Sequence, residues 1–145
     1  MRVDVLNQLA VARLAVIAAD ATVRTAAVAL SNPQIGLVVV CDGSGTIAGV
    51  ISKSDLVRHF RLGGVVDAPV ASQMSRDIVS CRSEDDLHAT WKVLAAQSLQ
   101  NIPVLGPDSK PLGVLDIRDA LKALFEQEEY QEQLLSNYVA GVGYQ

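Results

Sequence analysis

The chain of 145 residues has the length of one average domain, and half of its residues are hydrophobic. This composition supplies a sizeable core and excludes disorder over most of the length. The net charge of −4 comes from four glutamates beyond residue 125, since the first 125 residues carry 12 acidic and 12 basic side chains. Without a basic stripe, and with only 4% aromatic residues, the chain is not expected to bind nucleic acid.

The cysteines and histidines point to no metal chemistry. Cys41 and Cys81 lie in apolar runs and lack CxxC spacing, so we expect buried, inert thiols. Neither of the two histidines has a further ligand at metal-binding spacing, and no metal or required cofactor is predicted. The apolar run 9–19 is interrupted by Arg13 and is too short to cross a membrane. We therefore expect a cytoplasmic protein that does not bind membranes.

The chain repeats itself. A shift of 64 residues aligns residues 14–61 with residues 78–125 without a gap, and the apolar pattern matches nearly throughout. The paired elements are, in chain order, a strand at 14–17 and 78–81, an acidic turn at 20–22 and 84–86, a helix from 23 and from 87, a strand at 36–40 and 100–104, a turn at 42–45 and 106–109, a strand at 47–51 and 112–115, and a helix at 52–60 and 116–125.

Local signals support these elements. Val23, Ala26 and Leu30 have the spacing of a helix with one buried face. The segment 42–45, Asp-Gly-Ser-Gly, is typical of a hairpin turn and lacks the Lys-Ser/Thr of a phosphate-binding loop. Each copy is thus a β-α-β-β-α unit of about 48 residues, too small to be stable alone. Two copies are expected to pack their sheet faces against each other.

A C-terminal extension follows the repeat. Beyond Phe125 the chain continues for 20 residues, in which Tyr130, Leu134 and Tyr138 are spaced four apart. This spacing predicts that the preceding helix continues and ends at the glycines 141 and 143. The extension is interpreted either as a solvated helix or as a helix that packs on a second subunit.

Both copies end on the same short motif, Gly49-Val-Ile-Ser-Lys-Ser-Asp55 and Gly113-Val-Leu-Asp-Ile-Arg-Asp119. The pattern Gly–apolar–apolar–Ser/Thr–x–x–Asp, found twice, resembles the CBS-domain (cystathionine-beta-synthase domain) family, in which two units form a Bateman module. Residues 70–75 are similar to the entry segment of that family, and residues 101–104 to its strand before the hairpin. The resemblance implies a stand-alone tandem CBS protein with an α/β (α+β) fold, in which two repeats form one pseudo-symmetric module. Its parts would be repeat 1 at 3–61, a linker and entry segment at 62–77, repeat 2 at 78–125 and a helical tail at 126–145.

The Ser-x-x-Asp motif at the start of a helix has two interpretations. Ser52 and Asp55 have the spacing of a capping box. Free backbone N–H groups at the same place attract a phosphate, and a carboxylate accepts hydrogen bonds from ribose hydroxyls. In the CBS family, the residues of this motif bind the phosphate and ribose of adenine nucleotides while the base lies between apolar strand residues. The resemblance therefore favours a nucleotide site, with which capping can coexist.

The resemblance implies two such sites. The first would use Ser52 and Asp55 for the ribose and phosphate, with Lys53 near the phosphate, and around the base Val16, Ile17, Ala18, Leu37 and Val38. The second would use Asp119, with Arg118 as phosphate partner, and around the base Ser80, Cys81, Arg82, Asn101, Ile102 and Pro103.

The second site departs from the pattern of the family. Asp116 stands where the family usually has Ser or Thr, and it lies close to Asp119. Two acids at one helix start repel a phosphate, although Arg118 and Arg82 can offset this repulsion. We therefore expect the first site to prefer phosphorylated nucleotides, and the second to be weaker or to take a less charged ligand.

The expected function is regulatory binding without catalysis, because no catalytic motif surrounds the available serines, histidines and aspartates. The ligand would be an adenine nucleotide or adenosyl compound (AMP, ADP, ATP, S-adenosylmethionine or an NAD-type molecule), bound in the clefts between the repeats. The signal would pass through conformation or the geometry of a homodimer, since modules of this family commonly pair, to an unidentified effector protein. The alternative is a structural or protein-interaction module with vestigial sites, which Asp116 favours.

Overall fold

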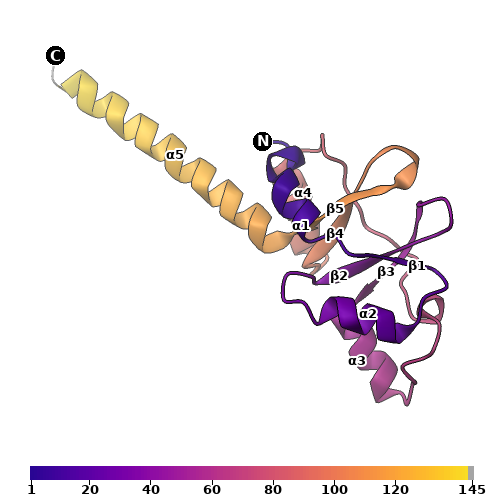
Figure 1. The fold of residues 1–145 in the computed structure, drawn as a ribbon. Helices are drawn as coiled ribbons and strands as arrows, with labels where there is room; N and C mark the ends of the chain where they lie inside the picture. The colour runs from indigo at the N-terminus through magenta and orange to yellow at the C-terminus, as the bar shows by residue number, and fades with distance from the viewer. Residues whose placement is uncertain (144–145) are drawn as a thin grey trace.

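The structure is a computed structural model that describes residues 1–143. Figure 1 shows a mixed module of short helices and strands, from which one long helix extends. In chain order the elements are η1 (Val3–Leu6), α1 (Asn7–Ala12), β1 (Val16–Ala18), α2 (Val23–Leu30), β2 (Leu37–Cys41), β3 (Ile47–Ser52), α3 (Lys53–Arg61), η2 (Val70–Ser72), α4 (Leu87–Ala96), β4 (Asn101–Leu105), η3 (Pro107–Ser109), β5 (Pro111–Asp116) and α5 (Ile117–Gly143), where η marks a 3₁₀ turn.

The two repeats build hairpins with the same register. In repeat 1, β2 pairs antiparallel with β3, Leu37 lies opposite Ser52, and the register shifts between Val40 and Cys41. In repeat 2, β4 pairs antiparallel with β5 in the equivalent register, and the shift falls at the equivalent place, between Val104 and Leu105. The expected α/β repeat fold is therefore confirmed. The two hairpins also share the position of their register shift.

The first strand differs between the repeats. In repeat 1, β1 runs parallel to β2 in a three-stranded sheet, and the Val39 N–H donates to the Ala15 carbonyl at 2.9 Å. In repeat 2 the expected strand 78–81 is reduced to a bridge between Cys81 and Val104. The residue equivalent to Val39 is Pro103, which has no N–H to donate, so the ladder cannot extend toward residue 79.

Buried residues form three apolar clusters. One lies in repeat 1, a second lies in repeat 2, and a third joins the repeats through Leu37, Val39 and Cys41 of β2 and Val114 of β5. Because strands alternate their side chains, β2 gives Val38 and Val40 to the core of repeat 1 and its other face to the partner repeat. The sheet faces thus pack against each other, as the repeat pattern predicted.

The two repeats exchange their entry segments. Val3 and Leu6 are buried in the core of repeat 2, whereas Val70 and Met74 are buried in the core of repeat 1. The exchange is tied by backbone hydrogen bonds, among them one from the Val3 N–H to the Asp85 carbonyl at 2.9 Å. Each repeat is therefore completed by the segment that precedes the other repeat in the sequence.

The repeated glycines make room for these exchanged segments. A Cβ atom on Gly113 would lie 2.8 Å from the backbone carbonyl carbon and from the Cβ of Ala10. A Cβ atom on Gly49 would lie 2.5 Å from Sδ of Met74 and 2.9 Å from the Ser75 carbonyl oxygen. The pair Gly49 and Gly113 thus marks where an entry segment crosses a strand at close range.

Both thiols are buried and free, as expected. Burial, assisted by the charge of Asp85, raises the pKa of Cys81 to about 12, and burial also raises the pKa of Cys41. The thiols are therefore protonated and unreactive at neutral pH.

The last helix, α5, leaves the module and extends away from it (Figure 1). The helix is described up to Gly143, the second of the two glycines predicted to end it; residues 144–145 of the tail lie outside the described residues. Beyond Phe125 the helix exposes a row of large apolar side chains: Tyr130, Leu134, Leu135, Tyr138 and Val139. Within residues 1–143, the helices are too short or too polar to be membrane spans.

Candidate ligand-binding site

A cleft of about 650 Å³ lies where the two repeats meet. One wall is the start of α3, with Ser52, Lys53 and Asp55. The facing wall belongs to repeat 2, from Ser98 at the end of α4 to Pro103 in β4. Further lining residues come from the loop before β2, from β2 and β3, from the entry segment of repeat 2 and from α5: Pro33, Gly36, Leu37, Val50, Ser54, Ser75, Asp77, Val79 and Arg118.

The first motif forms a capping box at the mouth of α3. The Asp55 N–H donates to Oγ of Ser52 at 3.3 Å, and Oδ2 of Asp55 accepts from the Ser52 N–H at 2.8 Å. The other carboxylate oxygen, Oδ1, accepts from Arg58, whose side chain is 59% exposed. Because the pairing with Arg58 is exposed, Oδ1 can exchange this partner for a ligand hydroxyl at small cost.

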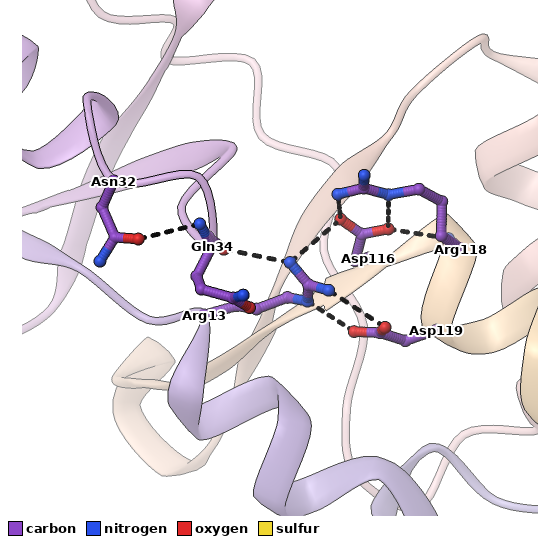
Figure 2. Close-up of polar contacts among 6 residues, drawn as sticks. All are labelled: Arg13, Asn32, Gln34, Asp116, Arg118 and Asp119. Carbon is purple, nitrogen blue, oxygen red and sulfur yellow. Dashed lines mark hydrogen bonds and ion pairs between the residues drawn. The ribbon is translucent and has the colours of Figure 1, made fainter.

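The second motif is closed by an arginine from elsewhere in the chain (Figure 2). Arg13, just beyond α1, donates from Nε and Nη2 to the two carboxylate oxygens of Asp119, at 2.5 and 3.1 Å. Its Nη1 donates to the Gln34 carbonyl at 3.1 Å and lies 3.6 Å from Oδ2 of Asp116. The guanidinium thus lies between the repeats and binds the carboxylate of Asp119, which was predicted to bind a ligand.

Asp116 is paired as well. It is 1% exposed, and Arg118 binds both of its oxygens, from Nε at 3.0 Å and Nη2 at 2.8 Å. Burial acts to raise the pKa of Asp116, but the hydrogen bonds from Arg118 and the charge of Arg13 outweigh it and hold that pKa below its ordinary value. The hydrogen bond to Asp119 raises the pKa of Arg13, and the hydrogen bond to Asp116 raises that of Arg118. The four side chains form one charge-balanced network.

The predicted site residues divide into two groups. Those that line the cleft come from both of the expected sites: Leu37, Ser52, Lys53, Asp55, Asn101, Ile102, Pro103 and Arg118. Those outside its lining are Val16, Ile17, Ala18, Val38, Ser80, Cys81, Arg82, Asp116 and Asp119. The structure therefore joins the first motif to the strand that was assigned to the second base pocket.

Packing in the cores accounts for three residues of the second group. Val38 and Ile17 point into the core of repeat 1, and Cys81 points into the core of repeat 2. Arg82 donates to the Gly106 carbonyl at 3.3 Å, so the acids of the second motif are balanced by Arg118 and Arg13 instead.

Sequence reasoning did not assign two charged residues that the structure places beside the motifs, Arg13 at Asp119 and Asp77 in the cleft lining. Both occupy the same place in their repeats, since the shift of 64 residues superimposes them, and Asp77 lines the cleft. One sequence signal could have found them. Each copy has a charged residue directly before its first strand, and this residue is basic in the first copy (Arg13) and acidic in the second (Asp77).

Groups suited to a metal ion are not present in the part of the chain that the structure describes. The site is instead a polar and apolar cleft at the junction of a strand, a helix N-terminus and a second repeat. Two β-α-β-β-α repeats that pack through their sheet faces, each with an acidic motif at the start of its last helix and with a cleft between them, define the class of protein to which the chain belongs.

The model of the CBS domain family matches residues 6–62 and 67–126. The chain belongs to the CBS domain family, as its motifs predicted. It is 23% identical over 94% of its length to an uncharacterized 17.7 kDa protein of Acidianus ambivalens, covering 83% of that protein. It is 28% identical over 74% of its length to the arabinose 5-phosphate isomerase GutQ of Escherichia coli, but spans only 33% of that longer enzyme.

Solved structures share the fold. A CBS domain protein from Pyrobaculum aerophilum complexed with AMP has a TM-score of 0.72 and 21% identity, over 82% of this chain and 89% of that one. The CBS domain pair of protein MJ0100, in complex with 5′-methylthioadenosine and S-adenosyl-L-methionine, has a TM-score of 0.73 and 13% identity, over 88% and 98%.

Proposed function

We propose that the protein is a regulatory module that binds an adenosyl ligand in the cleft between its repeats and performs no catalysis. The observation that carries the proposal is the cleft itself, which joins an acidic helix mouth at Asp55 to apolar strand residues of the other repeat. Its volume of about 650 Å³ falls in the range of small-molecule sites.

The lining supplies a partner for each part of such a ligand. Asp55 accepts from ribose hydroxyls, and the first turn of α3 with Lys53 attracts a phosphate. Ile102 and Pro103 offer apolar surface to the base. Oδ1 of Asn101 is buried and has no hydrogen-bond partner among residues 1–143, and an amino group of the base would satisfy it. The relatives complexed with AMP, 5′-methylthioadenosine and S-adenosyl-L-methionine support the ligand class.

Thermal unfolding against a ligand panel tests this proposal. We expect one of AMP, ADP, ATP, S-adenosylmethionine or NAD to raise Tm by about 5–10 °C when present at about one hundred times its dissociation constant, because binding then adds about 2.7 kcal/mol to the free energy of unfolding. The sample is first shown to be free of bound nucleotide. If no compound shifts Tm at millimolar concentration, the proposal is wrong and a protein-interaction module becomes the better account. The internal pairing of Arg13 with Asp119 already favours a structural role for the second motif.

We further propose that the signal passes through a homodimer in which α5 packs on a second copy. The exposed apolar side chains Leu134, Leu135 and Tyr138 are 50%, 65% and 70% accessible. A helix of this kind is stabilised when its apolar residues are buried against a partner.

The variant Leu134→Glu is expected to convert the dimer to a monomer, because a carboxylate would be buried at the contact. Light scattering after size-exclusion chromatography reads the mass directly. Gln133→Glu adds the same charge beside it on α5 and should leave the dimer intact. A parent protein that is monomeric at tens of micromolar would contradict this part of the proposal.

A further inference from the structure

We propose that Arg13 is a built-in occupant of the second motif, so that each chain carries one ligand site that is open and one that is closed from within. The inference rests on the proposed function, because it concerns the number of adenosyl ligands that one chain binds.

The contacts of Arg13 use every part of its guanidinium. Nε and Nη2 bind the two oxygens of Asp119, while Nη1 binds the Gln34 carbonyl and approaches Asp116. A forked pair of this kind is both strong and geometrically specific. It ties three parts of the chain together: the end of the entry segment, the loop between α2 and β2, and the start of α5.

The first motif, which opens into the cleft, has no arginine at the position equivalent to Arg13. The residue equivalent to Arg13 is Asp77, and the residue equivalent to Asp119 is Asp55. Two carboxylates cannot pair, so Asp77 leaves Asp55 to its exposed partner Arg58, and the cleft stays open. The two motifs therefore differ at one equivalent position: the first has Asp77 there and is open, and the second has Arg13 there and is filled.

Burial makes the Arg13 pair hard to displace. The side chains of Arg13 and Asp119 are 13% and 15% exposed, whereas Arg58 beside Asp55 is 59% exposed. A ribose that entered the second motif would replace charge-assisted hydrogen bonds by neutral hydroxyls, which bind a carboxylate less strongly. The displaced Arg13 guanidinium would also lose its hydrogen bonds to Asp119 and would need a new position near Asp116. The parent protein therefore should not fill this motif.

Isothermal titration calorimetry with AMP and with 5′-methylthioadenosine tests the inference. The parent should bind one ligand per chain, and this binding should weaken at least tenfold in Asp55→Asn. Arg13→Gln should bind two equivalents of 5′-methylthioadenosine, which carries no phosphate to be repelled by Asp116 and Asp119. Arg24→Gln, which removes an exposed arginine paired with Asp67, should still bind one.

The outcomes separate the two proposals. A parent that binds two ligands, or a folded Arg13→Gln protein that binds no more than the parent, overturns the role of Arg13. A parent that binds neither these two compounds nor any member of the thermal-unfolding panel overturns the proposed function, whereas a panel member that does bind replaces AMP in the titrations. If no compound binds the parent but Arg13→Gln gains one equivalent, the role of Arg13 stands, and if it gains none, that role falls too.

A second measurement covers the case in which Arg13→Gln does not fold. The side-chain Nε–H resonance of Arg13 in the parent should stay unshifted and protected from exchange at saturating ligand, while the backbone amides of residues 52–55 shift. Loss of that protection on ligand addition would show that the ligand displaces Arg13, and would overturn the proposal.

Discussion

Gly113→Ala is expected to lower the free energy of unfolding by about 2–3 kcal/mol, because the new methyl group has no space. It would lie 2.8 Å from the carbonyl carbon and 2.9 Å from the carbonyl oxygen of Ala10, and a backbone cannot rotate aside as a side chain can. The entry segment must shift, and with it Val3 and Leu6, which are 1% and 8% exposed in the core of repeat 2. Urea denaturation followed by circular dichroism measures the loss.

Gly43→Ala is the matched control for this effect. The glycine lies in the turn between β2 and β3, and a Cβ atom there would meet nothing within 4 Å. The control should stay within about 0.5 kcal/mol of the parent, as surface substitutions usually do. Equal stability of the Gly113 and Gly43 variants would show that α1 does not cross β5 as described.

The pattern of the repeat was accessible to sequence reasoning because it is local. Alternation, helical spacing and turn residues act within one copy, and they place the hairpins of both repeats and the helices that follow them. The same reasoning assigned a strand at 78–81, because the apolar run resembles the one that forms β1. It gave no weight to Pro103, whose missing N–H prevents the ladder from forming.

Contacts between distant segments were not accessible in the same way. The shift of 64 residues shows that Leu6 and Val70 are equivalent, but equivalence does not say on which repeat each one packs. Either assignment buries the same apolar area, so composition cannot choose between them. The exchange packs α1 against β5, and this crossing brings Arg13, just beyond α1, within reach of Asp119 in the first turn of α5.

The candidate site shows the same division. Ser52 and Asp55 were found from their spacing, because a capping box and a ligand mouth need the same local geometry. The residues that face them from repeat 2 were assigned to the other site, since the linear motif cannot say which strand lies across the cleft. The expected asymmetry between the two motifs was attributed to Asp116. The structure also places Arg13 against both Asp116 and Asp119, and this contact is the basis of the proposed closure of the second motif.

Asp55→Asn should weaken binding of the adenosyl ligand by about 10- to 100-fold, which corresponds to the 1.5–3 kcal/mol typical of hydrogen bonds to a charged group. The substitution keeps the shape of the side chain and removes the negative charge that accepts from the ribose hydroxyls. It also weakens the capping box with Ser52 and the contact with Arg58, and these together stabilise the fold by about 1 kcal/mol. Calorimetric titration is therefore performed well below Tm, where both proteins are folded.

Asp86→Asn separates the loss of a cap from the loss of a ligand. Asp86 is the N-cap residue of α4 and accepts from the Ala89 N–H at 2.9 Å, whereas Asp55 is the third residue of α3 and accepts from the N–H of its N-cap, Ser52. Both carboxylates therefore stabilise a helix start, but Asp86 does not line the cleft. It should therefore lose a comparable small amount of stability and keep the affinity of the parent. If Asp55→Asn binds as tightly as Asp86→Asn, the carboxylate of Asp55 serves only the helix, and the ligand has to be sought away from this mouth. If the two variants differ as expected, the charge at the start of α3 is what the ligand recognises, and the cap is the geometry that holds that charge in place.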